Sequence, residues 1–296
     1  MSKGFIMFAH NNNEIDYLKL AVVNALLIKQ NCNIKDVTVV TNQASYDYTT
    51  SQLGEEFVNN AISNIIITEK DKHFKSINTR LYKDTSHTSK PLPFYNVDRC
   101  DAYNLSPYDE TLLIDADYLI LSDTLNSCWG HENEFMMNWS YQDIMSERDD
   151  PTLKRLSGTG ITMYWATVVY FKKSAFAEQF FKTVAHVRDN REFYQDVYKW
   201  PGNLYRNDYS FSVAAHMMSG FVDKGIPQLP VPHLYKTFDT DDIHSAPAQN
   251  EIIFYLEKPK SLGDFMLCRW RHLDIHVMNK WALNRISEQL LEYANA

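Results

Sequence analysis

The stretch TLLIDADYLILSD, Thr111–Asp123, places two aspartates one residue apart between two apolar runs. In the extended backbone that ends a strand, residues i and i+2 point to the same side, so the carboxylates of Asp115 and Asp117 can reach one site. Ala116 between them leaves room for a ligand. Carboxylates at the end of a buried strand are costly unless they are exposed, hydrogen-bonded or bound to a cation. The pattern predicts a site for a hard divalent ion, Mn²⁺ or Mg²⁺, or else two caps of a turn.

The segments before this stretch alternate between apolar runs suited to strands and segments suited to helices. The expected strands are Gly4–Phe8, Asp36–Thr41, Asn64–Thr68 and Leu112–Ile114. Apolar residues recur at helical spacing from Glu14 to Gln30, with Asn12 or Asn13 as the cap, and Asp98–Leu105 can form a short helix. This alternation predicts an α/β fold with a parallel sheet covered by helices on both faces. Ligands bind beyond the carboxyl ends of the strands in such sheets.

After Asp123 the pattern becomes mixed α/β. The expected strands there are Glu134–Trp139, Gly160–Phe171 and Ile252–Glu257, and the expected helices are Ser174–Val187, Asn207–Met218 and Trp281–Tyr293. No Gly/Ser-rich or Pro-rich linker divides the chain, so one large domain or two closely joined halves are expected.

Bulk composition argues against several classes of protein. The formal net charge of −8 gives no overall attraction to nucleic acid or anionic lipid. No apolar segment is long enough to span a membrane, and the start lacks a signal-peptide core. The four cysteines lie far apart without C-x-x-C spacing, which disfavours a disulfide framework or a zinc ribbon. We therefore expect a cytoplasmic protein without a membrane span.

The order of strand, Asn-rich loop, helix and DRCDAYNLSPYDETLLIDADYLIL resembles nucleotide-sugar glycosyltransferases of the GT-A class, and most closely the glycogenin-like retaining enzymes. The resemblance implies a GT-A type α/β fold, with a Rossmann-like, mostly parallel sheet, a mixed second half and helices on both faces. It also implies a single domain over residues 1–296. Residues 1–125 would bind the nucleotide sugar, and residues 126–296 would take the acceptor and complete the metal site.

The resemblance assigns roles in binding the donor, expected to be a UDP-sugar. Asp115 and Asp117 would hold Mn²⁺ and the diphosphate, Tyr17 would stack on the uracil, and Arg99 would touch the donor. Tyr17 alone is more often a half-buried helix residue. The other implied donor-binding residues are Ala9, His10, Asn11, Ala116, Thr167 and Lys280.

The segment IHVMNKWAL, Ile275–Leu283, resembles the family's C-terminal signature. It would supply His276 as the third metal ligand and Lys280 beside the phosphates, with Trp281 next to it. A nitrogen ligand among oxygens favours Mn²⁺ over Mg²⁺. The sequence departs from the family because Asn279 and Ala282 replace the usual glycine and proline. A single histidine is more often structural than metal-binding.

The middle of the chain resembles the part of the family that surrounds the donor sugar. By this resemblance Ala166 and Thr167 would lie beside the sugar, and Asn207 and Asp208 would hydrogen-bond it. Asp208 also suits a helix N-cap. The catalytic candidates are therefore Asp208, Asn207 and Lys280. The resemblance favours retention of anomeric configuration, whereas Asp208 as a general base would mean inversion.

Other interpretations concern the reaction and the acceptor. A haloacid-dehalogenase-like phosphatase would use the first Asp as nucleophile and FDTDD, Phe238–Asp242, as its later acidic motif, but its D-x-D belongs near the N-terminus. A non-catalytic nucleotide-binding protein is a second alternative. FAHNNNEIDYLKLA also resembles glycosyltransferase-like proteins of large tailed phages, some of which add sugars to modified cytosines in DNA. A DNA acceptor would contact the basic run from Lys70 to Lys90 and the patch at Arg269 and Arg271, and carbohydrate or lipid-carrier acceptors are equally compatible.

Overall fold

The computed structural model of the chain describes residues 1–69, 79–148, 150–157, 160–200, 202, 205–231, 233–259, 261 and 263–294. Its central sheet has six strands in the order β3-β2-β1-β6-β10-β8. Their bounds are β1 Lys3–Phe8, β2 Val37–Thr41, β3 Asn64–Ile67, β6 Glu110–Asp115, β8 Phe135–Asn138 and β10 Trp165–Lys172. β3, β2, β1 and β6 pair in parallel, and β10 is antiparallel to both β6 and β8. The mostly parallel sheet with a mixed second half is therefore confirmed.

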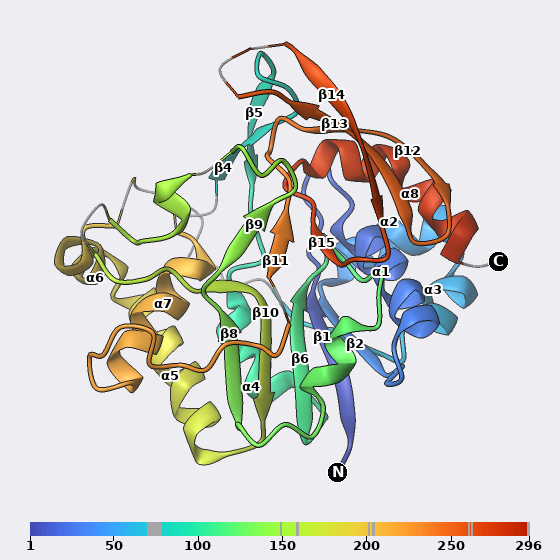
Figure 1. The fold of residues 1–296 in the computed structure, drawn as a ribbon. Coiled ribbons are helices and arrows are strands. Elements are labelled where there is room, and N and C mark those ends of the chain that lie inside the picture. Colours follow the sequence, from blue (N-terminus) through green and yellow to red (C-terminus); the bar gives the residue numbers. More distant parts are fainter. Residues whose placement is uncertain are drawn as a thin grey trace.

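Helices cover both faces of this sheet (Figure 1). On one side lie α1 (Tyr17–Asn31), α2 (Gln43–Leu53) and α3 (Glu55–Ala61), with α8 (Lys280–Ala294) packed on α1. On the other side lie α4 (Ala102–Leu105), α5 (Ala175–Asp189) and α7 (Asn207–Met218), with α6 (Arg191–Tyr198) next to α5. The alternation of β1 explains the two layers. Phe5 and Met7 enter the core cluster that includes α1, whereas Ile6 and Phe8 enter the cluster that includes α5 and α7.

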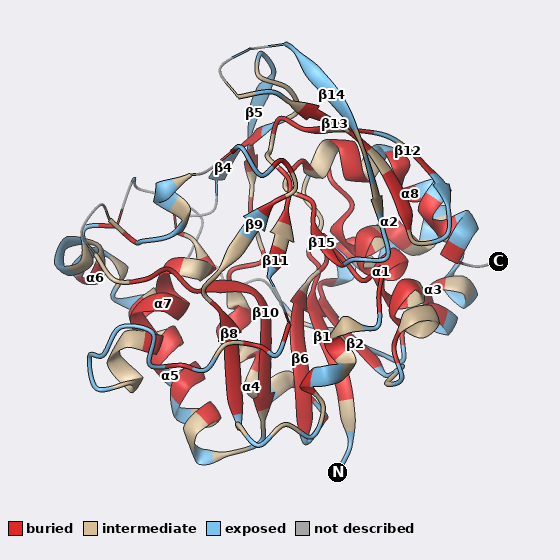
Figure 2. Ribbon diagram, viewed as in Figure 1, coloured by how far each residue is buried: buried red, intermediate tan, exposed pale blue. Residues whose placement is uncertain are grey.

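Smaller sheets lie beyond the carboxyl ends of the central strands. One has the order β7-β15-β11-β9 and a second has the order β12-β13-β14, while β4 and β5 form a hairpin. Their bounds are β4 Thr79–Lys83, β5 Ser89–Pro93, β7 Tyr118–Leu119, β9 Tyr141–Asp143, β11 Leu234–Lys236, β12 Asp242–Ala248, β13 Glu251–Glu257, β14 Phe265–Arg271 and β15 Ile275–His276. Short 3-10 helices span η2 Asp98–Asp101, η3 Thr124–Cys128 and η4 Pro151–Leu153. Figure 2 shows the central strands buried and much of β14 exposed.

Two boundaries differ from the sequence-based expectation. α1 begins at Tyr17, because Asp16 is its N-cap and accepts a hydrogen bond from Lys19 N at 2.9 Å. Asn12 instead accepts from Ile15 N at 2.8 Å, which turns the loop before the helix. The apolar run from Gly160 becomes a central strand only at Trp165.

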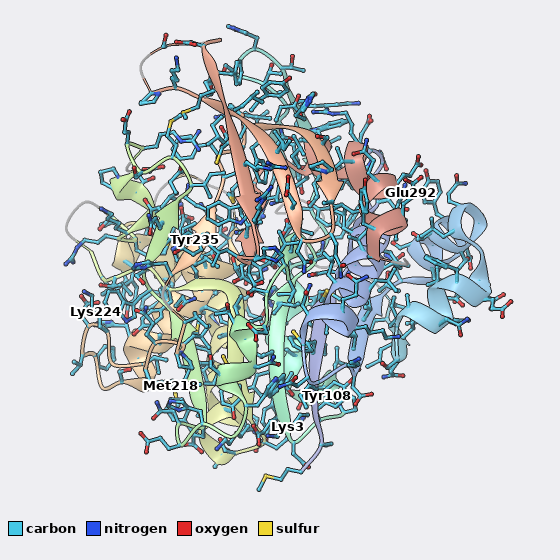
Figure 3. The ribbon with its side chains drawn as sticks, turned by 45° about the vertical axis from the view of Figure 1, so that its right-hand side comes forward. Lys3, Tyr108, Met218, Lys224, Tyr235 and Glu292 are labelled. Carbon is cyan, nitrogen blue, oxygen red and sulfur yellow. The ribbon has the colours of Figure 1, made fainter. Side chains whose placement is uncertain are left out.

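The amino end of the sheet is closed by a tight contact. A side chain at Gly4 would place its Cβ 2.3 Å from the ring of Tyr108, so this position of β1 requires glycine. Figure 3 shows Tyr108 and Lys3 at this end of the molecule. No helix among the residues that the structure describes is both long and apolar enough to cross a membrane.

Candidate active site

The D-x-D lies where β6 ends. Asp115 is the last residue of β6 and is in register with Phe8, the last residue of β1. Asp117 directly precedes β7, and β7 pairs antiparallel with β15, where His276 is opposite Tyr118. Val277 N also donates to Asp117 O at 3.0 Å. The small sheet therefore brings His276 from near the end of the chain to the two aspartates.

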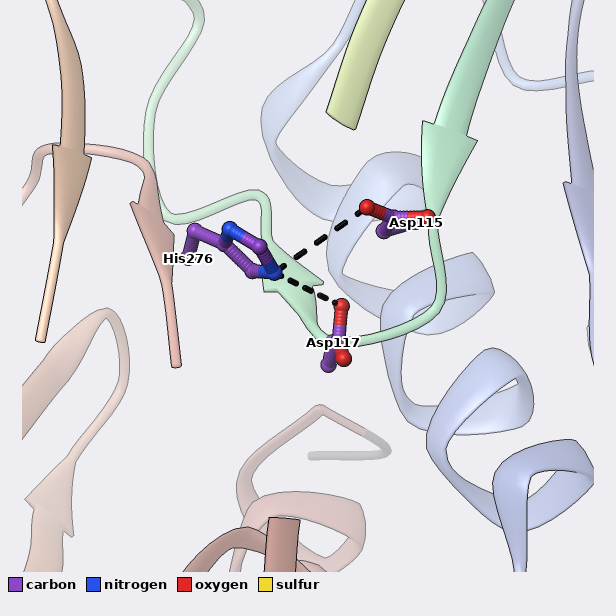
Figure 4. A group of neighbouring side chains, drawn as sticks. All are labelled: Asp115, Asp117 and His276. Carbon is purple, nitrogen blue, oxygen red and sulfur yellow. Dashed lines mark ion pairs between the residues drawn. The ribbon is translucent and has the colours of Figure 1, made fainter. Parts of the chain in front are cut away.

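The three side chains form a cluster with one ligand atom each (Figure 4). His276 Nε2 lies 3.2 Å from Asp117 Oδ1 and 4.0 Å from Asp115 Oδ2, and the three ligand atoms lie within 4.8 Å of one another. Asp117 Oδ1 is buried and accepts no hydrogen bond. Two carboxylates and an imidazole lie close together, and one of the carboxylate oxygens is buried without a hydrogen-bond partner. This set of ligand atoms fits a divalent cation.

Lys280 sets the electrostatics of this cluster. Its Nζ lies 2.6 Å from Asp117 Oδ2, and both side chains are nearly buried. Burial would raise the pKa of Asp117, but Lys280 first and His276 second outweigh it and hold that pKa below its usual value. Burial, and then the charge of Lys280, lowers the pKa of His276. A neutral imidazole at neutral pH is the form that coordinates a metal.

Arg99 connects the D-x-D to β10. It lies on η2, makes an ion pair with Asp115, and donates from Nη2 to Ala166 O at 2.5 Å. Burial lowers the pKa of Arg99 to about 10, so the guanidinium stays charged at neutral pH. A cation is therefore fixed beside the half-exposed carboxylate of Asp115.

Asp208 lies on the other side of Ala166. Its Oδ1 accepts from Ala166 N at 3.0 Å, and its Oδ2 pairs with Arg206 at 2.9 Å. Burial would raise the pKa of Asp208, but Arg206 and the other partners lower it overall. Arg206 is the N-cap residue of α7, so Asp208 lies in the first turn and is not the cap. The buried Asn207 Oδ1 has no hydrogen-bond partner.

These side chains line a cleft of about 270 Å³. It brings together the predicted residues Tyr17, Arg99, Asp115, Ala116, Asp117, Ala166, Thr167, Asn207, Asp208, His276 and Lys280. The cleft also takes residues that the sequence did not single out for the site: Phe8, Arg80, Leu81, Tyr82, Lys83, Phe94, Asn96, Arg206, Asp239 and Met278. The basic run from Lys70 to Lys90 was a partial signal, because it contains Arg80 and Lys83. Its members Lys70, Lys72 and Lys75 lie outside the described residues.

Of the four donor-binding residues predicted near the end of β1, only Tyr17 lines the cleft. Tyr17 is buried in the cleft wall, and its hydroxyl is 3.0 Å from that of Tyr82. Ala9, His10 and Asn11 do not line the cleft. His10 N donates to Asn96 Oδ1 at 2.8 Å, and Asn11 lines a separate cavity of about 370 Å³ formed by the Asn-rich loop and the start of α2. Trp281 follows Lys280 on α8 and does not line the cleft either.

No family model and no curated protein sequence matches the chain. Several solved structures are similar to it. The galactosyltransferase LgtC, in complex with donor and acceptor sugar analogues, is 14% identical over 79% of this chain and 73% of its own, with a TM-score of 0.41. GlyE of Streptococcus pneumoniae is 10% identical over 78% and 45%, with a TM-score of 0.42. Mouse xyloside xylosyltransferase 1 is 12% identical over 73% and 82%, with a TM-score of 0.43. Similarity at this level does not identify the function of the chain, which has to be inferred from the residues of its own site.

Proposed function

We propose that the chain is a glycosyltransferase that moves a sugar from a nucleotide-diphosphate sugar to an acceptor, with UDP as the expected nucleotide. The observation that carries the proposal is the convergence of Asp115, Asp117 and His276 at the carboxyl end of β6. Lys280 lies against this cluster, and Tyr17 and Asp208 belong to the same cleft. A metal-ligand cluster, a lysine and an aromatic side chain in the wall of one cleft are the parts needed to bind a nucleoside diphosphate.

Each group has a role that its chemistry supports. Asp115, Asp117 and His276 would hold the cation, and the nitrogen ligand favours Mn²⁺. A bound divalent cation supplies positive charge to the oxygens of the leaving diphosphate. Lys280 and Arg99 stabilise the same negative charge from buried positions, where electrostatic interactions are stronger than in water.

The surroundings of Asp208 support a retaining reaction. Both of its oxygens are engaged, one by Ala166 N and one by Arg206, and its pKa is lowered. A general base works best when its pKa lies near the working pH, so Asp208 is a weak candidate for inversion. The anomeric configuration of the product, read by proton NMR, tests this assignment.

Calorimetric titration of UDP with and without Mn²⁺ tests the proposed function. We expect binding that needs Mn²⁺ in the wild type, loss of that binding in Asp117→Asn, and unchanged binding in Asp123→Asn. Asp123 lies in the same sequence stretch but is exposed and outside the cleft, so it is the matched control. If UDP, GDP, CMP and dTDP all fail to bind, the D-x-D is only a turn and the proposal is wrong.

A phosphatase and a non-catalytic nucleotide-binding protein would each be recognised by a different assay. In a phosphatase Asp115 would be the nucleophile, with an acid of FDTDD beside it. Asp241 of that motif is buried in an ion pair with Arg148, whereas Asp239 lines the cleft and pairs with Lys83. Hydrolysis of p-nitrophenyl phosphate that is lost in Asp115→Asn would support that enzyme class instead. A non-catalytic protein would bind UDP and Mn²⁺ without releasing UDP from any UDP-sugar.

A further inference from the structure

The side chains that line the cleft include one more Lys or Arg than Asp. The cationic side chains among the described lining residues are Arg80, Lys83, Arg99, Arg206 and Lys280, and the carboxylates are Asp115, Asp117, Asp208 and Asp239. Each carboxylate has its own cation: Arg99 with Asp115, Lys280 with Asp117, Arg206 with Asp208, and Lys83 with Asp239. Within this described lining, Arg80 is the cation that makes no ion pair with a carboxylate, although the charge of Asp208 acts on it.

Arg80 is held firmly but is poorly satisfied. It lies on β4, and its guanidinium carbon is 3.4 Å from the centre of the Phe94 ring. Nη2 reaches Tyr205 O at 3.4 Å, which is a long hydrogen bond, and Nε is buried without a partner. A buried donor on a charged group is costly when unpaired. The position therefore suits an anion that a ligand brings.

The proposed function accounts for the other charges and leaves Arg80 unused. When a divalent cation neutralises Asp115 and Asp117, Arg99 and Lys280 are two positive charges for the two negative charges of a sugar-linked diphosphate. Lys83 and Arg206 keep their carboxylate partners. The cleft lining then carries one positive charge more than is needed to balance the diphosphate of a donor whose sugar is neutral.

Arg80 points to the end of the cleft where α7 begins. Its hydrogen bond goes to Tyr205 O, one residue before Arg206, the N-cap residue of α7. α7 has twelve residues and no side-chain cap hydrogen bond, so its first turn adds positive potential at the same place. Arg206 adds a second guanidinium that is 27% exposed. This end of the cleft also contains Asn207 and Asp208, the residues expected beside the sugar.

We propose that Arg80, with Arg206 and the start of α7, binds a third anionic group, a carboxylate or a phosphate carried close to the transferred sugar. The inference rests on the proposed function and narrows its substrate class. Two sources share this chemistry. The anion is either on the donor sugar, as in a UDP-uronic acid, or on the acceptor, as in a sugar phosphate.

Calorimetric titrations with Mn²⁺ separate these sources. The donor arm compares UDP, UDP-glucose and UDP-glucuronate, and the acceptor arm titrates glucose 6-phosphate or glucose into protein saturated with UDP. The proteins are the wild type, Arg80→Gln and Lys90→Gln. Lys90 lies on the other strand of the hairpin, is exposed and pairs with Glu14 outside the cleft, so it is the matched control. Thermal unfolding checks that both variants fold.

We expect the wild type and Lys90→Gln to prefer the anionic member in one arm by about tenfold or more, which is typical of a charge-assisted hydrogen bond. Arg80→Gln should lose that preference and still bind UDP. An unchanged preference in Arg80→Gln overturns the inference, as does no preference in either arm of the wild type. Equal weakening of UDP also overturns it, because Arg80 would then contact the diphosphate. If the wild type binds none of UDP, GDP, CMP and dTDP, the proposed function itself fails.

Discussion

His276 presents its two ring nitrogens to different partners. Nε2 faces the aspartates, and Nδ1 lies 3.3 Å from Thr167 Oγ1. A hydrogen bond from Nδ1 to the hydroxyl leaves the lone pair on Nε2, where a metal is expected. We predict that Thr167→Val lowers Mn²⁺ affinity, measured calorimetrically with UDP present, by about tenfold. Thr167→Ser keeps the hydroxyl and should bind like the wild type, and equal affinities in all three proteins would contradict this role.

Asp274 is a buried carboxyl whose pKa is raised to about 7, mainly by burial. Its Oδ1 accepts hydrogen bonds from Leu121 N, Ser122 N and the Ser122 hydroxyl, and its Oδ2 has no partner. The folded-state pKa lies above the unfolded value of 3.8, so the folded protein binds the proton more tightly. The stability this confers is complete below about pH 4 and is lost as the pH rises through about 7.

We therefore predict that Asp274→Asn gains stability relative to the wild type as the pH rises. Asparagine stays neutral at every pH, so the difference in the free energy of unfolding should shift in its favour by about 1 to 4 kcal/mol between pH 4 and pH 8. Urea unfolding of both proteins at these two pH values measures the shift. A difference that does not change with pH would show that Asp274 titrates normally.

Helix α1 holds strand β7 through one buried amide. Asn24 Nδ2 donates to Tyr118 O at 2.7 Å, and Asn24 Oδ1 accepts from Ile120 N at 3.1 Å, so the side chain pairs with both backbone groups. Asn24→Leu would leave both groups buried and unpaired, at about 1–3 kcal/mol each. We predict a loss of about 2–5 kcal/mol in the free energy of unfolding, measured by urea denaturation. Lys19→Ala, which removes an ion pair between the same helix and the exposed Glu288, should change it by less than about 1 kcal/mol.

The elements with a clear apolar period were predictable from the sequence. The strands of the central sheet and helices α5, α7 and α8 appear close to their expected residues, except that β10 begins at Trp165 and not at Gly160. The start of α1 was wrong by three residues, because Asn12, Asn13 and Asp16 are all good caps and only the tertiary contacts choose among them. The hairpin β4–β5 was not predicted. Its turn is held by residues that lie far away in the sequence. Arg285 Nη1 donates to Asp84 at 2.8 Å, and Asn279 Nδ2 donates to Asp84 O at 2.9 Å.

The candidate site was predictable to the extent that its residues stand in short motifs. Asp115, Asp117, His276 and Lys280 were singled out with their neighbours, and the structure places them together. Arg80 and Tyr82 have no motif. They reach the cleft on a hairpin whose turn is tied to α8 through Arg285 and Asp84 and to β13 through Ser86 and Glu257. A residue that joins a site through such packing leaves no local signal in the chain.

The distribution of charge over the whole molecule bears on the acceptor. The net charge is −8, and Arg269 and Arg271 on β14 both pair with Glu251. Lys90 pairs with Glu14, so much of the described part of the two basic patches is neutralised. We predict weak binding to duplex DNA at 0.15 M salt, with a Kd above about 10⁻⁶ M by fluorescence anisotropy. Tighter binding that falls steeply with salt would favour a DNA acceptor.

Helix α8 closes the molecule by packing on the first helix, and its first residue, Lys280, reaches the cleft. Gln30 on α1 donates to the carbonyls of Tyr293 and Ala294 at 3.2 and 2.8 Å, and Leu283 is fully buried. The helix therefore acts as a rigid support for Lys280. A substitution in its buried face should lower the stability of the protein without changing how the cleft binds UDP.

We predict that Leu283→Ala lowers the free energy of unfolding by about 2–5 kcal/mol, because it opens a cavity between packed elements. UDP affinity of the folded fraction should stay within about twofold of the wild type, since Lys280 is still held against Asp117. Urea unfolding and calorimetry below the transition measure the two quantities. Tyr293→Ala, at the partly exposed end of the same helix, should change neither by much. A large loss of affinity in stable, folded Leu283→Ala would mean that α8 moves during binding, and Lys280 would then be brought to the diphosphate by the ligand instead of being held in place.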